Sequence, residues 1–424
     1  MVFFPNCDEL DKLGAYIQKI EQDNPNIGIC KIVSPQMWYQ REYNLEDIKL
    51  NVDPSQQVTS GISGAYNVTY LEEKKVSLQK FAADAMTTNE YTENLKDKES
   101  LFWRSLGKGV SPYYAADIEG SLFTGQEHNN TKAGKRGWTM DGALSDMLRL
   151  IPNIVPGVNT TMLYIGTWKT MFAFHVEDQD LYSINYLHTG APKSWYSIQP
   201  SDRNRLESLA EGYFANELRT CKEYLRHKTK LFSPKLLQSC GLSYDTVVQR
   251  PGEFVVTFPG AYHAGFNHNF NIAEATNFAT PRWLQTVARK AKRCVCRPHS
   301  VFVDPDELEH LVRLEQQRLE GGSGAHGVES SSSYCSPERT NTNSESISFK
   351  RNNKRSAKKR KRQEDSTCQK GPVVSNKKQQ RQVLTTIEGF IFYVSYSYVI
   401  TISGPNSCSS RSCNGLGRRA AGAF

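Results

Sequence analysis

The feature that most constrains this chain is a series of short, β-rich runs between about residue 155 and residue 280. The runs are TMLYIG, TMFAF, LYSINYL, SWYSI, EFVVTF and NIAEATNF, and Gly, Pro, Asn and Asp residues separate them. Short strands divided by turn residues are typical of an antiparallel sandwich or barrel. A helical pattern over about residues 201–240 interrupts the series. We therefore predict a mainly β protein of the α+β class, with one helical insert in its main domain.

Helical patterns lie on both sides of these strands. Leu10, Leu13, Ile17 and Ile20 follow helical spacing, and GICKIVSP then predicts a short strand that ends at a proline. Residues 77–86, residues 95–105 and DPDELEHLVRLEQQRLE carry further helical patterns. We predict a small N-terminal unit over 1–41, a mixed α/β region over 42–135, the main domain over 136–300 and a helical extension over 301–320.

The composition changes after about residue 320, where Gly, Ser, Asn and Lys replace the aromatic residues. This change predicts a disordered, basic, low-complexity tail over 321–424. Nine of the thirteen residues from Lys350 to Arg362 are basic, and the whole chain has a formal net charge of +8. A solvated run is one interpretation. A nuclear-localisation signal or a weak DNA contact are the functional ones, and we expect a nuclear protein.

Neither the cysteines nor the apolar segments indicate a secreted or membrane protein. Ten cysteines spread over 424 residues do not resemble a disulfide framework, so we expect a reducing compartment in which a few cysteines bind metal. The N-terminal MVFFPNCDELDKLG carries acids and does not predict a signal sequence. The longest apolar stretch, residues 389–402, is short and rich in Ser and Tyr, so we expect no membrane span.

A candidate metal site follows from one of the β-rich runs. His175 ends TMFAF and Glu177 lies two residues further on, so in an extended chain both side chains point to the same face. His263, in FPGAYHAGFNHNFNIAE, follows another strand and supplies a third ligand. Two histidines and one carboxylate form the facial triad that binds Fe(II) and leaves positions open. Taken singly, each histidine is more often a satisfied polar group at a strand edge.

A second signal concerns the co-substrate that such an iron site uses. The distal carboxylate of 2-oxoglutarate needs a buried cation together with hydroxyl or amide donors. Lys193 lies in a β-rich run between Pro192 and SWY, and Asn185 lies earlier in LYSINYL. The alternative for Lys193 is a solvated hairpin residue. His188 has no partner in this scheme, and we interpret it as structural.

Three segments resemble the jumonji-C histone lysine demethylases. They are FHVEDQDLYSINYLHTGAPKSWYSI, FPGAYHAGFNHNFNIAEATNFATPRW and LRHK. Within that family they are most similar to the trimethyl-lysine subfamily, which acts on lysine-9 and lysine-36 of histone H3, and the first 40 residues resemble its jumonji-N segment. The resemblance runs from about residue 2 to about residue 300. It implies a double-stranded β-helix of the jelly-roll or cupin type, with a jumonji-N unit and a structural zinc site.

The resemblance also assigns roles to residues. It implies iron ligation by His175, Glu177 and His263, and 2-oxoglutarate binding by Tyr114, Asn185 and Lys193, with Phe172 and Trp195 lining the pocket. It implies a methyl-lysine cage of Gly157, Tyr164, Glu177, Ala275 and Asn277, histone-backbone contacts from Asn67 and Asp117, and zinc ligation by Cys221, His227, Cys294 and Cys296. Three cysteines and one histidine form a closed, four-coordinate site, which is typical of structural rather than catalytic zinc.

The implied activity is oxidative demethylation of tri- and dimethylated lysine on the histone H3 tail, with release of formaldehyde and succinate. Histone H3 and nucleosomes would then be the partners. Three positions depart from the family pattern, namely Met162, Phe174 and Ala275, and they bear on the preferred methylation state or site. Two alternatives stay open: a protein hydroxylase of the same fold, and a non-catalytic chromatin scaffold.

Overall fold

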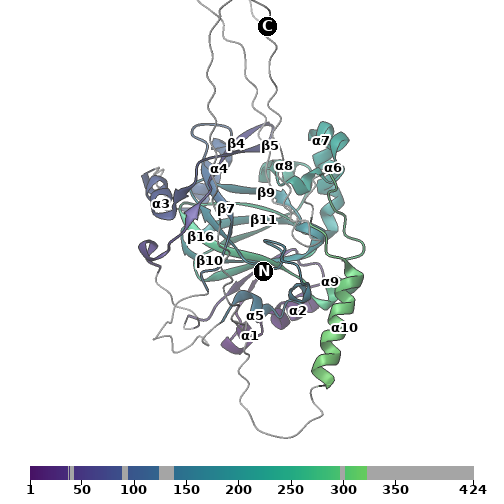
Figure 1. The fold of residues 1–424 in the computed structure, drawn as a ribbon. Helices are drawn as coiled ribbons and strands as arrows, with labels where there is room; N and C mark the ends of the chain where they lie inside the picture. Colours follow the sequence, from purple (N-terminus) through teal and green to yellow (C-terminus); the bar gives the residue numbers. More distant parts are fainter. Residues whose placement is uncertain (37, 39–42, 88–93, 124–137, 297–300, 322–424) are drawn as a thin grey trace, which may run out of the picture. The chain divides into compact units, whose positions relative to one another are not determined.

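The fold is built around two antiparallel sheets (Figure 1). The computed structural model describes residues 1–36, 38, 43–87, 94–123, 138–296 and 301–321. The predicted tail from residue 322 onward, with the basic run and the apolar stretch 389–402, lies outside these residues. Within them, the larger sheet has ten strands and the smaller sheet has four.

The order of the strands brings distant segments together. The larger sheet runs β1 (Val2–Phe3), β2 (Ile29–Val33), β14 (Glu253–Thr257), β10 (Tyr182–Gly190), β16 (Asn271–Phe278), β8 (Met162–Gly166), β7 (Tyr113–Glu119), β4 (Ser55–Ile62), β5 (Ala65–Glu72) and β12 (Lys230–Phe232). The smaller sheet runs β13 (Asp245–Gln249), β11 (Lys193–Ile198), β15 (Tyr262–Asn267) and β9 (Met171–His175). Strands β3 (Asn51–Val52) and β6 (Val76–Ser77) form a separate pair. In both sheets the pairings are antiparallel except that of β1 with β2.

Each of the six β-rich runs contains a strand, and the predicted α+β fold class is confirmed. The sequence pattern missed β15, whose sequence YHAGFN places Ala and Gly, residues depleted in strands, between Tyr and Phe. It also missed the β4–β5 hairpin, whose residues SQQVTSGI and AYNVTYLE are mostly polar and half-exposed. The predicted runs were recognised by their β-branched and aromatic residues, which β15 carries more sparsely and the hairpin mixes with polar residues, so both misses have a physical cause.

The helices begin and end close to the predicted positions. Helices α1 (Cys7–Asp11), α2 (Leu13–Asp23), α3 (Leu78–Thr87), α4 (Leu95–Ser105) and α10 (Pro305–Gly321) match the expected segments. The insert contains α6 (Arg203–Tyr213), α7 (Ala215–Thr220), the 3₁₀ turn η5 (Tyr224–His227) and α8 (Pro234–Ser239). The insert was predicted to be helical, but it also contains strand β12, which pairs with β5. None of the described helices combines the length and apolar character needed to cross a membrane.

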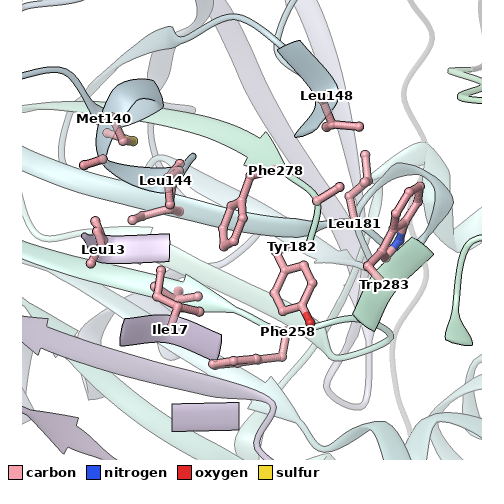
Figure 2. Packing of buried hydrophobic residues seen from close by; sticks show 14 of the residues in the cluster. Leu13, Ile17, Met140, Leu144, Leu148, Leu181, Tyr182, Phe258, Phe278 and Trp283 are labelled. Atoms are coloured by element: carbon pink, nitrogen blue, oxygen red, sulfur yellow. The ribbon is translucent and has the colours of Figure 1, made fainter. Parts of the chain in front are cut away.

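The N-terminal residues pack directly against the larger sheet. Helix α2 presents Leu13 and Ile17 to the core that also holds Tyr182, Phe258 and Phe278 (Figure 2). Strand β2 pairs with β14 and so continues the sheet at its edge. Fully burying an aliphatic side chain of this size contributes about 1.5–3 kcal/mol, so this interface anchors the N-terminal unit. Its assignment as a jumonji-N segment stays a prediction.

A buried carboxylate also joins α2 to the larger sheet. Glu21 is 5% exposed, accepts a hydrogen bond of 2.6 Å from the Tyr182 hydroxyl and pairs with the guanidinium of Arg282. The Arg282 side chain is 48% exposed, so water shares its charge. Glu21 therefore depends on its partners more than Arg282 does.

We expect Glu21→Ala to lower the free energy of unfolding by about 2–3 kcal/mol, because a charged hydrogen bond is lost inside the interface. Arg282→Ala should cost at least as much, because it leaves the buried Glu21 carboxylate without its counter-charge. Urea denaturation of both variants measures the difference. A loss well below about 1 kcal/mol in Arg282→Ala would show that this ion pair does not stabilise the interface.

Candidate active site

Three predicted ligands meet where β9 lies beside β15. His175 is the last residue of β9, Glu177 follows in extended backbone, and His263 is the second residue of β15. His175 and His263 are direct partners across the two antiparallel strands. One ligand atom from each of the three residues lies within 4.8 Å of the others. His263 lies 88 positions after His175 and 86 positions after Glu177 in the sequence. The pairing of β9 with β15 brings these three residues together.

Backbone carbonyls orient both imidazole rings. The Nδ1 atom of His175 lies 2.7 Å from the carbonyl oxygen of Ala173, and the Nδ1 atom of His263 lies 3.1 Å from that of Ala261. A carbonyl can only accept, so Nδ1 carries the proton in each ring and Nε2 carries a lone pair. The two Nε2 atoms lie 3.8 Å and 3.2 Å from the same oxygen of Glu177. Two lone pairs and a carboxylate that converge in this way fit a divalent cation such as Fe(II).

The protonation preferences agree with a ligand role. Burial, together with the neighbouring His263 and Lys228, holds the pKa of His175 well below its ordinary value, so the ring is neutral. Burial alone would raise the pKa of Glu177, but His263, Lys228 and His175 outweigh it and hold that pKa well below its usual range. The site therefore presents a neutral imidazole and an ionised carboxylate, which are the forms that bind metal.

A second candidate metal site connects the insert with the segment that follows α9 (Pro281–Thr286). Cys221, His227, Cys294 and Cys296 form it, as predicted, with neighbouring ligand atoms 3.1 to 3.6 Å apart. The corners of a tetrahedron with Zn–S bonds of about 2.3 Å lie about 3.7 Å apart, so the cluster fits zinc closely. Burial and the neighbouring cysteine thiols raise the pKa of Cys221 to about 12. A cation is therefore needed to hold the thiolate form.

Lys193 lies inside the protein rather than on a hairpin surface. It is the first residue of β11 and 1% exposed, and its Nζ atom donates a 2.6 Å hydrogen bond to Oδ1 of Asn267. Burial lowers the pKa of Lys193 to about 7. Among the described residues, no carboxylate forms an ion pair with Lys193. A buried amine in this state favours an anionic ligand, because that ligand restores the charge that burial disfavours. The solvated alternative for Lys193 is wrong.

Asn267 is a residue of this pocket that the sequence pattern did not single out. Its Oδ1 atom accepts from Lys193 and, at 3.0 Å, from Asn271, while its Nδ2 atom donates to the Thr170 hydroxyl at 2.8 Å. The Tyr114 hydroxyl, a predicted co-substrate contact, also interacts with Asn267. Asn267 lies four residues after His263 on the same strand, so the strand period of two could have identified it.

The other predicted co-substrate residues surround Lys193. The rings of Phe172 and Trp195 lie 4.6 Å apart, and the Lys193 ammonium lies 5.8 Å from the centre of the Phe172 ring. Gln249 connects Asn185 with Trp195. Its Nε2 atom donates to Asn185 Oδ1 at 3.1 Å, and its Oε1 atom accepts from the Trp195 indole N–H. Gln249 is fully buried and was also missed, because no motif marks it.

Part of the predicted methyl-lysine cage lies beside the candidate iron ligands. The Tyr164 hydroxyl donates a 3.0 Å hydrogen bond to Asp117, and Glu177 lies close enough to Tyr164 to help raise its pKa. Asp117 has a φ of 55°, a left-handed conformation that few residues other than glycine adopt, at an irregularity in the pairing of β7 with β8. Such outliers concentrate at functional sites.

The remaining candidates fall into two groups. Ala275 and Asn277 lie on β16, where Ala275 pairs with Asn185 on one side and with Met162 on the other. The backbone N–H of Asn277 donates to the carbonyl oxygen of Gly157 at 3.4 Å, so these cage candidates share one region of the sheet.

Asn67 instead contacts the insert. Its Oδ1 atom accepts a 2.6 Å hydrogen bond from Lys230, which also contacts Glu217 at 2.6 Å, and sequence patterns did not identify Lys230. Phe174, which departs from the family pattern, is fully buried and packs 5.9 Å from the Phe232 ring. It therefore belongs to the core.

His188 has structural partners, in keeping with the interpretation of it as structural. Its Nε2 atom lies 2.9 Å from the fully buried carboxylate of Glu274, and its Nδ1 atom contacts the Tyr43 hydroxyl. Glu274 also accepts hydrogen bonds from Ser121 and from the backbone N–H of Leu122. This network fastens the segment after β7 to the middle of the larger sheet.

Comparison with known proteins identifies the domain that carries both histidines and the glutamate. A family model described as "JmjC domain, hydroxylase" matches residues 162–278. These residues form a JmjC domain. It contains the strands β8 to β11 and β13 to β16 together with the insert, so the match covers the three candidate iron ligands and Lys193.

Similarity to curated relatives extends beyond the JmjC domain. The chain is 39% identical over 329 residues to the probable lysine-specific demethylase 4F of Homo sapiens, which is 75% of this chain and 50% of that relative. It is 38% identical to lysine-specific demethylase 4B of Mus musculus, over 74% of this chain and 29% of that relative. It is also 38% identical to lysine-specific demethylase 4D of Rattus norvegicus, over 75% of this chain and 62% of that relative. The chain thus spans between about a third and two thirds of these relatives' own lengths.

We expect Cys296→Ser to remove bound zinc and to lower the thermal midpoint, because the hydroxyl is a poor zinc ligand and the insert loses its tie to the segment after α9. Elemental analysis gives the zinc content and calorimetry gives the midpoint. Cys240→Ser is the matched control, since Cys240 is an exposed cysteine outside the cluster. Zinc content that is unchanged in Cys296→Ser would remove Cys296 from the site.

Proposed function

We propose that this chain is an Fe(II)- and 2-oxoglutarate-dependent histone lysine demethylase. It removes methyl groups from tri- and dimethylated lysine on the histone H3 tail, at lysine-9, at lysine-36 or at both. The observation that carries the proposal is the convergence of His175, Glu177 and His263 in a JmjC domain that also holds a buried lysine. The relatives printed as lysine-specific demethylases support lysine demethylation over other oxidations.

The JmjC domain implies Fe(II) and 2-oxoglutarate, and the residues present fit both. When bound, they supply the oxidation by dioxygen that converts an N-methyl group to formaldehyde while 2-oxoglutarate becomes succinate and carbon dioxide. His175, Glu177 and His263 would hold the iron and leave the positions that the co-substrate and dioxygen need. The protein itself contributes orientation, charge and the exclusion of water.

Lys193 and its neighbours would bind the distal carboxylate of 2-oxoglutarate. The Lys193 ammonium provides the charge, and the Tyr114 hydroxyl adds a donor near the same Asn267 side chain. Because Asn267 fixes the Lys193 Nζ atom before the ligand arrives, little side-chain entropy is lost on binding. Phe172 and Trp195 close the apolar side of this pocket.

The methylated lysine would lie beside Tyr164 and Glu177. A methylated ammonium carries a diffuse positive charge, and oxygens and aromatic faces attract it without strong hydrogen bonds. Ala275, Asn277 and Gly157 would complete the cage from β16 and the segment before β8. Asp117 and Asn67 would contact the backbone of the histone tail.

Two alternatives differ from this proposal in their predicted products. A protein hydroxylase of the same fold would add oxygen to its substrate, and the family description includes hydroxylases. A non-catalytic scaffold would bind histone without turnover. The presence of all three ligand candidates and Lys193 favours catalysis. We further propose a nuclear location with nucleosomes as partners, to which the basic run at 350–362 would contribute.

Formaldehyde release from a trimethylated histone H3 tail peptide tests the activity. We expect His175→Ala to abolish release while the fold and the zinc content stay unchanged, because one iron ligand is lost and the zinc cluster lies elsewhere. His310→Ala, which alters an exposed histidine on α10, is the matched control and should keep full activity. Formaldehyde release by His175→Ala would contradict the assignment of the iron site.

Co-substrate binding should weaken as the pH rises through about 7. In the free protein the pKa of Lys193 is lowered to about 7 by burial, so the ammonium loses its proton above that pH. The bound carboxylate favours the charged form, so binding takes up a proton and the KM for 2-oxoglutarate should rise about tenfold per pH unit above 7. Steady-state kinetics between about pH 6 and pH 9 measure this. A flat KM would show that Lys193 stays charged.

A further inference from the structure

The backbone turn that directly follows the iron-ligand candidate Glu177 is strained. Gln179 has a φ of 52° and Asp180 has a φ of 51°, so two consecutive residues that are not glycine adopt the left-handed conformation. This conformation brings the Cβ atom close to the carbonyl oxygen and costs free energy at each position. The turn persists only if contacts around it compensate for that cost.

The first compensating contact is a pair of hydrogen bonds to the segment that precedes α10. The Gln179 Nε2 atom donates to the carbonyl oxygen of Val303 at 2.7 Å, and the N–H of Val303 donates to Gln179 Oε1 at 2.8 Å. Gln179 is 3% exposed, so these bonds replace hydration that the amide has lost. The Trp283 indole N–H also donates to the carbonyl oxygen of Gln179 at 3.2 Å.

Hydrophobic packing supports this side of the turn. Leu181, the residue that follows the turn, belongs to the same core cluster as Trp283 and Val303 (Figure 2). The Gln179 side chain therefore joins the turn to a part of the chain that is already anchored in the core. The two bonded residues are 124 positions apart in the sequence.

The second compensating contact comes from the insert. The Arg226 guanidinium donates to the backbone carbonyl of Glu177 at 2.7 Å and to the Asp180 carboxylate at 2.7 Å. Arg203 contacts the other oxygen of Asp180 at 2.7 Å. Arg226 lies next to His227, a zinc-ligand candidate, so the zinc cluster fixes the segment from which Arg226 reaches the turn.

We infer that Gln179 and Arg226 are positioning residues that hold the Glu177 carboxylate where the two histidines converge. The inference rests on the proposed iron site. Only one residue separates Glu177 from Gln179, so relaxation of the strained φ angles would displace the Glu177 backbone and its carboxylate. Gln179 holds the turn from the C-terminal side and Arg226 holds it from the insert side. Neither residue is needed to contact the metal.

Manganese binding tests this inference without turnover. Mn(II) prefers carboxylate and imidazole ligands to thiolates, so it reports on the His175–Glu177–His263 site and not on the cysteine cluster. Electron paramagnetic resonance of free Mn(II) gives the affinity for the full chain. We expect Gln179→Met, which fills the same space without the two hydrogen bonds, to bind Mn(II) about 10-fold to 100-fold more weakly.

Gln79→Met is the matched control. The Gln79 Nε2 atom donates to the carbonyl oxygens of Leu45 and Ile48, so the same substitution removes two hydrogen bonds to the backbone away from the turn. The positioning role predicts unchanged Mn(II) affinity in this variant, whatever its thermal midpoint. Gln179→Gly removes the same two bonds as Gln179→Met in a residue that accepts positive φ, so it should fold and should also bind Mn(II) weakly.

The outcomes separate the inference from the site on which it rests. Weak Mn(II) binding by both Gln179 variants, with normal binding by Gln79→Met, supports the positioning role. Normal binding by the Gln179 variants, with a lowered thermal midpoint, would overturn it and leave Gln179 a purely structural residue. Mn(II) binding by the wild type that persists unchanged in His175→Ala would overturn the proposed iron site itself.

Discussion

The structure depends on the meeting of two imidazole lone pairs and one carboxylate oxygen beside the paired strands β9 and β15. Backbone carbonyls of Ala173 and Ala261 fix the tautomer of each ring, and the strand register places the rings opposite each other. Such a cluster of buried acceptors is unfavourable by itself, since each group has lost water. The site therefore favours a bound cation, and the rest of the fold has to hold the three ligands in a rigid frame.

That frame contains buried polar networks in addition to apolar packing. Asn267 holds Lys193, Gln249 connects Trp195 with Asn185, and Glu274 holds the segment after β7. A half-satisfied network of this kind destabilises a protein, whereas a complete one specifies a single arrangement. The zinc cluster and the interface with α2 extend the same rigidity to the insert and the N-terminus.

Much of the fold and site could be predicted from the sequence because the signals were local. Short β-rich runs separated by turn residues identified six strands, and a period of two placed His175 and Glu177 on one face. The rest depended on contacts between distant residues. Strand β15 carries Ala and Gly where the predicted runs carry stronger strand formers, and the partners of Lys193 and Gln179 lie 74 and 124 positions away. The family resemblance supplied roles for Asn67 and Asp117 that no spacing rule indicates, and those roles stay predictions.

The proposed reaction is removal of a methyl group, as opposed to addition of oxygen to the substrate or binding alone. Mass spectrometry of a trimethylated histone H3 tail peptide, incubated with the full chain, Fe(II), ascorbate and 2-oxoglutarate, tests this most directly. The account predicts a product lighter by the mass of one methylene group, which appears only when 2-oxoglutarate is present. A product heavier by one oxygen atom, or a peptide of unchanged mass, would contradict it.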